Sequence, residues 1–336
     1  MLVKSKRGWE LPDRDATPEG LYLTRRRFVT ALAAGPILAG TLLGGCDDTG
    51  ADAGKKAAAA ATDDPSAKLY PVARNMRYGV DRALTDEKFA TSYNNFYEFG
   101  SHKEIAKAAQ ALAIRPWTVK IDGMVEKERT IAIDDLLRQM PLEERVYRFR
   151  CVEAWAMTVP WSGFSLKALV DFARPLSSAK YLRMETFLDA AVAPGQKASW
   201  YPWPYVEGLT IAEATNELAF IATGLYGKPI ARQNGAPLRL VVPWKYGFKN
   251  VKSLVRLSFT AERPRTFWEA IEGREYGFWA NVNPQVPHPR WSQATEKLLG
   301  EGSSFEPKKV PTQLYNGYGE YVAPLYAELK GERLFM

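Results

Sequence analysis

Polar and apolar residues alternate along several short segments of the chain, which is the pattern of half-buried β-strands. The strands predicted from this pattern and from β-branched residues are 117–125, 130–132, 144–152, 181–187, 218–223, 238–242 and 251–260. Helices are predicted over 101–112, 133–140 and 164–173. The first of these opens with Ser101-His102-Lys103-Glu104, which has the form of a capping box.

The order of these elements predicts an α+β fold with mixed sheets and peripheral helices. Strands and helices do not alternate regularly, which argues against a barrel or a doubly wound parallel sheet. From about residue 281 to 318, prolines and polar residues predict a long ordered coil that wraps the core. We therefore expect a single domain over 69–336.

The first 46 residues have the pattern of a twin-arginine export signal. The run Thr24-Arg25-Arg26-Arg27-Phe28 precedes an apolar stretch over 28–45 that Gly and Pro residues interrupt. A membrane-spanning helix is the alternative, but this stretch is shorter than the roughly 20 residues such a helix needs. We expect export in the folded state to the periplasm, a route that is compatible with a bulky cofactor.

The segment that follows the signal is predicted to be a flexible linker. Residues 47–68 are small, polar and rich in alanine, with no apolar period. The sequence Leu43-Gly44-Gly45-Cys46 resembles a lipoprotein cleavage site, so lipid anchoring at Cys46 is an alternative to a soluble mature protein. We favour the soluble form.

The composition indicates a globular domain and argues against a nucleic-acid-binding protein. Of 336 residues, 46% are hydrophobic and 12% aromatic, enough for a packed core. The net charge is +7, of which residues 1–46 contribute seven Lys/Arg against four Asp/Glu, leaving about +4 for the rest. The basic stripe typical of nucleic-acid binding is therefore not predicted.

The chain has two cysteines, and only Cys151 lies within the predicted folded domain. A buried small hydrophobe is the ordinary interpretation of such a residue. Arg148 and Arg150 precede it, however, and would favour its thiolate, the form that binds a soft metal. A nucleophilic Cys-His arrangement with His102 or His288 is a weaker alternative, and motifs for zinc, haem c, iron–sulfur clusters, nicotinamide and P-loop nucleotides are missing from the sequence.

Several longer segments carry a family resemblance. They are NNFYEFG at 94–100, RCVEAWAMTVPW at 150–161, YPWPYVEGL at 201–209, QNGAPLRLVVPWKYGFKNVKSL at 233–254 and HPRWSQAT at 288–295. Over 70–336 the chain resembles the molybdenum-containing catalytic subunits of periplasmic protein-methionine-sulfoxide reductases, the MsrP family within the sulfite-oxidase superfamily. The resemblance implies a sulfite-oxidase-type molybdopterin-binding fold.

The resemblance also implies a cofactor and its ligands. One molybdenum would be held by the two sulfurs of a single molybdopterin, in the form without a nucleotide, and by Cys151. The residues implied to bind this cofactor are Asn94, Tyr97, Glu98, Cys151, Thr186, Asn234, Arg239, Asn250, Val251 and Lys252. Arg239 and Lys252 are the natural phosphate partners. Without the family, Asn234 would be interpreted as a turn residue, Arg239 as solvent-facing and Tyr97 as core.

Glu153 is the second predicted catalytic residue. It lies two positions after Cys151, on the same face of a predicted extended strand, and would position oxygen or protons near the metal. A surface glutamate in a salt bridge is the alternative.

The implied reaction is the reduction of protein-bound methionine sulfoxide to methionine by oxygen-atom transfer. Electrons would come from a haem-containing integral membrane partner that draws on the quinone pool. A tolerant surface for oxidised protein substrates is predicted from the aromatic residues Trp161, Trp203, Tyr205, Trp244 and Tyr246. The rival functions are a sulfite-oxidase-like enzyme acting on sulfite or another S- or N-oxide, and a periplasmic ligand-binding protein.

Overall fold

The computed structural model describes residues 64–303 and 306–336, which form two β-sheets with short helices. The helices are α3 (Glu87–Ser92), α4 (Ala106–Ala109), α5 (Ile133–Gln139), α6 (Leu166–Ala173), α7 (Ile211–Ala214), α8 (Phe267–Glu272) and α9 (Gly319–Val322). The strands are β1 (Thr118–Gly123), β2 (Arg129–Ala132), β3 (Glu143–Arg150), β4 (Trp155–Ser165), β5 (Tyr181–Thr186), β6 (Val206–Thr210), β7 (Phe220–Leu225), β8 (Lys228–Pro229), β9 (Arg239–Val241), β10 (Leu254–Thr260), β11 (Thr295–Gly302) and β12 (Pro307–Pro311). The α+β prediction is confirmed.

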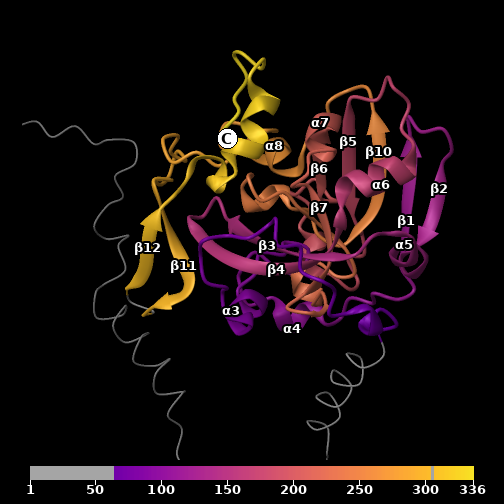
Figure 1. Ribbon diagram of the computed structural model, residues 1–336, viewed down its shortest axis with the longest axis horizontal. Coiled ribbons are helices and arrows are strands. Elements are labelled where there is room, and N and C mark those ends of the chain that lie inside the picture. The colour runs from indigo at the N-terminus through magenta and orange to yellow at the C-terminus, as the bar shows by residue number, and fades with distance from the viewer. Residues whose placement is uncertain (1–63, 304–305) are drawn as a thin grey trace, which may run out of the picture. The chain divides into compact units, whose positions relative to one another are not determined.

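The first sheet has five strands in the order β2-β1-β10-β5-β6. Its strands stand upright in Figure 1, and only the β1–β10 pairing is parallel. In β5, Leu182, Met184 and Thr186 are buried and alternate with half-buried residues, as the sequence pattern predicts. The predicted strands 117–125, 130–132 and 251–260 correspond to β1, β2 and β10.

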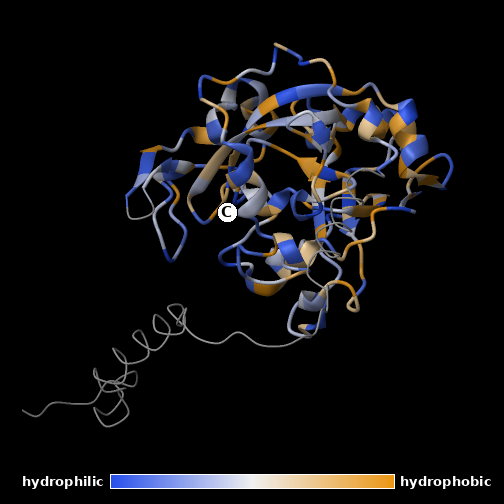
Figure 2. Ribbon diagram, turned by 90° about the horizontal axis from the view of Figure 1, so that it is seen from below, coloured by the Kyte–Doolittle hydropathy of each residue, from blue (hydrophilic) through white to orange (hydrophobic). Residues whose placement is uncertain are grey.

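The second sheet has seven strands, and β4 is its central member. β3 pairs with β4 along its length, while β11 and β7 also pair with β4, and β9 pairs with β7. β3 and β4 cross the view of Figure 1, and the β11–β12 hairpin lies at its left. Hydrophobic residues gather toward the middle of this folded body, and many outer loops are hydrophilic (Figure 2).

The loop between β9 and β10 joins the two sheets and so positions part of the site. β9 belongs to the seven-stranded sheet and β10 to the five-stranded one. The backbone N–H of Leu240 donates to Val251 O at 2.9 Å, and that of Leu254 donates to Leu238 O at 3.2 Å. These bonds hold the intervening residues against both sheets, whose strands share one hydrophobic core.

Three expectations about the elements are wrong. The predicted helix 101–112 is reduced to α4, whose N-cap Ile105 makes no side-chain cap bond. β4 was not predicted, because Pro160, Ser162 and Gly163 interrupt the strand pattern. The predicted coil 281–318 contains β11 and β12, because β11 pairs in parallel with β4 and antiparallel with β12.

The predicted export signal and the linker up to residue 63 lie outside the described residues. The last five residues of that linker are folded onto the domain: Ser66 is buried, and Arg115 Nη2 lies 3.2 Å from Asp64 Oδ1. The described body therefore starts at least five residues before the predicted boundary. No helix within the described ranges has the length and apolar character needed to cross a membrane.

Candidate active site

A cavity of about 600 Å³ gathers side chains from distant parts of the chain. They come from the segment after α3, from the β3–β4 turn, from the β9 region with its following loop, and from 201–205, 268–276 and 290–291. The predicted site residues that line it are Asn94, Tyr97, Glu98, Cys151, Glu153, Asn234, Arg239, Asn250, Val251 and Lys252. Thr186 is the predicted residue outside this lining; it is buried at the end of β5, where its hydroxyl donates to Ser253 O at 3.4 Å.

Cys151 occupies a tight turn between β3 and β4. The N–H of Ala154 donates to Cys151 O at 3.0 Å, and the N–H of Cys151 donates to Trp155 O at 2.9 Å. Ala154 has a φ of 65°, in the left-handed region. The expectation that Glu153 shares a face of an extended strand with Cys151 is therefore wrong, yet the turn places Glu153 Oε2 3.5 Å from Cys151 Sγ.

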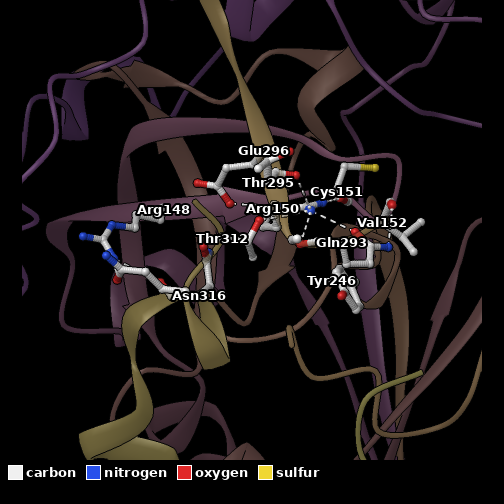
Figure 3. A network of polar contacts seen from close by, with 12 residues as sticks. Arg148, Arg150, Cys151, Val152, Tyr246, Gln293, Thr295, Glu296, Thr312 and Asn316 are labelled. Atoms are coloured by element: carbon white, nitrogen blue, oxygen red, sulfur yellow. Dashed lines mark hydrogen bonds and ion pairs between the residues drawn. The ribbon is translucent and has the colours of Figure 1, made fainter. Parts of the chain in front are cut away.

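Arg150 holds this turn from the protein side (Figure 3). Its guanidinium is fully buried and donates to Glu296 Oε2 at 3.1 Å, Gln293 Oε1 at 2.8 Å and the carbonyl oxygen of Cys151. Val152 O accepts two more bonds, from Trp291 Nε1 at 2.8 Å and Gln293 Nε2 at 2.9 Å. The segment 291–296 therefore fixes the backbone that presents the thiol.

The expectation that the flanking arginines favour the thiolate is only partly right for the protein alone: the charge of Arg150 lowers the pKa of the Cys151 thiol, but less than burial raises it. Arg148 donates to Asp81, Gln313 and Asn316 O, on the far side of Figure 3 from the sulfur of Cys151. Burial raises the pKa of the Cys151 thiol to about 12, and the Glu153 carboxylate adds to this increase. A bound metal cation is the ordinary means of deprotonating such a thiol.

Glu153 belongs to a polar cluster whose other members the sequence analysis missed. Three atoms donate to Glu153 Oε2: Lys103 Nζ at 2.6 Å, Asn95 Nδ2 at 3.0 Å and Trp155 Nε1 at 2.9 Å. Burial alone would raise the pKa of Glu153, but these hydrogen bonds and the Lys103 charge outweigh it and lower the pKa. The available signals, Lys103 inside an apparent capping box and Trp155 in an apolar run, both point to structural roles.

Two buried asparagines leave acceptors unpaired in the cavity. Asn94 Nδ2 and Asn234 Nδ2 both donate to Ala90 O at 3.0 Å. Their Oδ1 atoms are buried and accept no hydrogen bond from the described residues. Because a buried acceptor without a partner is costly, these atoms fit a ligand that carries N–H groups. Asn234 is thus more than a turn residue.

Two cations in the cavity make no salt bridge within the described residues. Arg239 is buried in β9 and donates to three carbonyls, including Asn234 O at 2.9 Å and Asn250 O at 3.0 Å. Lys252 Nζ donates to Asn95 O at 2.7 Å and Gln233 O at 2.6 Å. Burial lowers the pKa of both groups, which shows that an anion would stabilise them here. The idea that Arg239 faces solvent is wrong.

The other predicted site residues, Asn250, Val251 and Glu98, already interact with neighbouring residues of the protein. Asn250 Oδ1 accepts from the N–H of Val242 at 2.8 Å. The N–H groups of Asn250 and Val251 donate to Gly247 O at 3.0 Å and Lys249 O at 3.1 Å, so both residues line the cavity with these groups already paired. Burial raises the pKa of Glu98 to about 7, and the charge of Lys252 acts against this increase.

Of the five residues predicted for the aromatic surface, only Tyr205 lines the cavity within the described residues. Trp161 and Trp244 are fully buried, Tyr246 is 2% exposed and Tyr205 is 8% exposed, since they pack in the core. Trp203 is half-buried, with its ring 4.9 Å from that of Phe267. The aromatic residues that line the cavity beside Tyr205 are Tyr93, Phe96, Tyr97, Phe149, Trp155, Tyr201, Phe248, Trp268, Tyr276 and Trp291.

The cavity therefore fits a polar anionic cofactor with a metal. It combines a thiol, two cations without carboxylate partners and two buried acceptors without donors, all within the described residues. A molybdopterin, with its phosphate, its pterin N–H groups and its metal, meets each of these needs. A purely apolar ligand would leave them unmet.

Comparisons with known proteins agree with this chemistry. The family model described as oxidoreductase molybdopterin binding domain matches residues 105–268. The chain is 49% identical over 333 residues to the protein-methionine-sulfoxide reductase catalytic subunit MsrP of Pseudomonas syringae pv. tomato, covering 97% of this chain and 98% of that relative. A solved structure, the sulfane dehydrogenase SoxCD from Paracoccus pantotrophus, is similar with a TM-score of 0.42 and 16% identity, over 83% of this chain and 68% of that one.

Proposed function

The chain belongs to the family of protein-methionine-sulfoxide reductase catalytic subunits, and on this basis we propose that it reduces methionine sulfoxide in proteins at the cavity around Cys151. The observation that carries the proposal is the convergence on one cavity of a thiol, two cations without carboxylate partners and two orphaned amide oxygens. When bound, a molybdenum-molybdopterin centre supplies oxygen-atom transfer, so that a sulfoxide, two electrons and two protons give a thioether and water.

The residues of the cavity divide the work of holding this cofactor. Cys151 would supply the protein thiolate to the metal, and the turn anchored by Arg150 fixes the direction of this side chain. Arg239 and Lys252 would neutralise the phosphate. Asn94 and Asn234, whose Oδ1 atoms lack a donor within the described residues, would accept hydrogen bonds from the pterin.

The other cavity residues serve the substrate. The aromatic lining, including Tyr201 and Trp268, offers an apolar surface to a methionine side chain and to its neighbours in a protein substrate. Glu153 lies close enough to Cys151 to contact the substrate oxygen or a water near the metal.

The reaction is tested by following both directions of oxygen transfer. With a reduced artificial electron donor, we expect the enzyme to remove one oxygen per methionine sulfoxide from an oxidised protein, as mass spectrometry would show. The rival sulfite-oxidase-like function favours oxidation of sulfite with an electron acceptor. Sulfite oxidation without any sulfoxide reduction would contradict the proposal.

Arg239 provides a test of the cofactor assignment. We expect Arg239→Met to lose most of its bound pterin, because a charge-assisted hydrogen bond contributes about 1.5–3 kcal/mol, or roughly 10- to 100-fold in affinity. Arg239→Lys keeps the charge and should retain more. Pterin fluorescence after denaturation measures the content, and equal pterin in wild type and Arg239→Met would show that the phosphate lies elsewhere.

We propose further that the mature protein works in the periplasm with a haem-containing membrane subunit as electron donor. The twin-arginine pattern at 24–28 supports export. The relative from Pseudomonas syringae is named a catalytic subunit, which supports a partner subunit. Cell fractionation tests the first point, and co-purification of membrane haem with the catalytic chain tests the second.

A further inference from the structure

One oxygen of Glu153 receives all the hydrogen bonds that the described residues give to this carboxylate. Oε2 accepts from Lys103 Nζ at 2.6 Å, from Trp155 Nε1 at 2.9 Å and from Asn95 Nδ2 at 3.0 Å. Trp155 belongs to the start of β4 and Asn95 to the segment after α3, so the donors come from separate parts of the fold. The same Oε2 atom lies 3.5 Å from Cys151 Sγ, and Oε1 accepts no hydrogen bond from the described residues.

Among the described residues that contact Glu153, Lys103 is the only cation. The local backbone conformation directs its side chain toward the Glu153 carboxylate. The segment 101–105 could have continued α4 toward the N-terminus, yet it is irregular, and Lys103 O accepts a bond from the N–H of Asn94 at 3.3 Å. The side chain is 21% exposed and also donates to Asn95 Oδ1. Lys103 thus contacts both neighbours of the thiol, since Asn95 Nδ2 lies 3.7 Å from Cys151 Sγ.

A cation is needed here on electrostatic grounds. Once Cys151 binds a metal as a thiolate, its sulfur and the Glu153 carboxylate are two anionic groups 3.5 Å apart. Such groups repel each other strongly where burial limits screening by water. The Lys103 ammonium offsets this repulsion and prevents the carboxylate from rotating away.

Resting on the proposed function, we infer that Lys103 is a positioning residue for oxygen-atom transfer. It acts through Glu153: it fixes the carboxylate, whose Oε2 lies 3.5 Å from Cys151 Sγ, next to the reacting position. It also adds a positive charge near the metal, which favours the reduced state of the centre.

The test compares Lys103→Met and Lys103→Arg with the wild type, each loaded with molybdenum. We expect Lys103→Met to lower kcat by about 10- to 100-fold, the usual effect of removing a group that orients a metal-site residue, with a smaller change in KM. The midpoint potential of the metal centre should fall, and its electron paramagnetic resonance spectrum should change. Lys103→Arg should recover much of kcat and potential.

A double-mutant cycle distinguishes positioning from general stability. In a Glu153→Gln background, Lys103→Met should add little to the loss of kcat, because the group it positions is already altered. Lys107→Met is the matched control, since Lys107 is an exposed lysine of α4 outside the cavity lining, and it should leave kcat and potential unchanged.

Two outcomes would overturn the inference alone. Both outcomes assume that the wild type carries molybdenum and reduces sulfoxide. The first is that Lys103→Met leaves kcat and the midpoint potential unchanged. The second is that Lys103→Met lowers kcat by the same factor in the wild-type and Glu153→Gln backgrounds. A wild type without molybdenum or without sulfoxide reduction would instead overturn the proposed function and the inference with it. If Lys103→Met does not fold, Lys103→Gln keeps a polar group at the site and gives the same comparison.

Discussion

Cys151→Ser is expected to reduce methionine-sulfoxide turnover to background and to remove most of the bound molybdenum. A serine hydroxyl is a harder ligand than a thiolate and does not deprotonate at neutral pH, so it replaces the thiolate poorly. The only other cysteine in the sequence is Cys46, at the edge of the predicted export signal. The described residues therefore contain no second thiol that could bind the metal in place of Cys151.

The fold should survive this change, which makes the loss informative. Serine occupies nearly the same volume, and its burial costs about 1–3 kcal/mol. Circular dichroism and thermal unfolding would verify a folded protein, and Cys46→Ser is the control that should keep full activity. Retained turnover in folded Cys151→Ser would contradict the role of Cys151.

Arg150→Met is expected to lower the free energy of unfolding by about 3–5 kcal/mol, because it leaves buried polar groups without their cation. The change removes the buried partner of Glu296 and the donor to Cys151 O. Arg82, whose Nη1 lies 2.7 Å from Glu296 Oε1, would compensate only one of the two carboxylate oxygens. We expect weaker molybdenum retention as well, because the turn that presents the thiol loses its anchor.

Denaturant unfolding of the protein loaded with metal measures this effect. The control is Arg138→Met, which breaks an exposed pair with Asp135 and should cost no more than about 1 kcal/mol. A loss of similar size in the two variants would show that the Arg150 cluster does not anchor the turn.

The sequence predicts best those elements whose pattern is set by one buried face. β1, β5 and α5 lie close to their predicted bounds because their apolar positions follow the period of strand or helix. β4 was not predicted because it is buried on both faces and so shows no alternation. Its conformation depends on pairing with β3 and β7, which accommodates Pro160. The β11–β12 hairpin likewise depends on a long-range pairing.

The site was predictable where long motifs carry a family resemblance. That resemblance selected Asn94, Asn234, Arg239 and Lys252 from distant segments, and the fold brings them to one cavity with Cys151. Local reasoning about charge was only partly right: Arg148 binds Gln313 rather than the thiol, and the Arg150 charge lowers the pKa of Cys151 less than burial raises it. Which side chains meet depends on tertiary contacts that a single sequence does not contain.

The same limit explains the missed polar cluster. Lys103, Asn95 and Trp155 each have an ordinary local interpretation, as a helix cap, a loop residue and a core aromatic. Only the fold shows that their donors converge on Glu153 Oε2. A cluster assembled from three segments leaves no spacing that a motif could record.

The central claim is that Cys151 and the surrounding cavity hold a molybdenum-molybdopterin centre. The most direct measurement is the molybdenum and pterin content of purified wild-type protein, produced in cells that make the cofactor and compared with folded Cys151→Ser. We predict about one molybdenum and one pterin per wild-type chain and much less metal in the variant. Folded wild-type protein without molybdenum, or equal metal in both proteins, would contradict the claim.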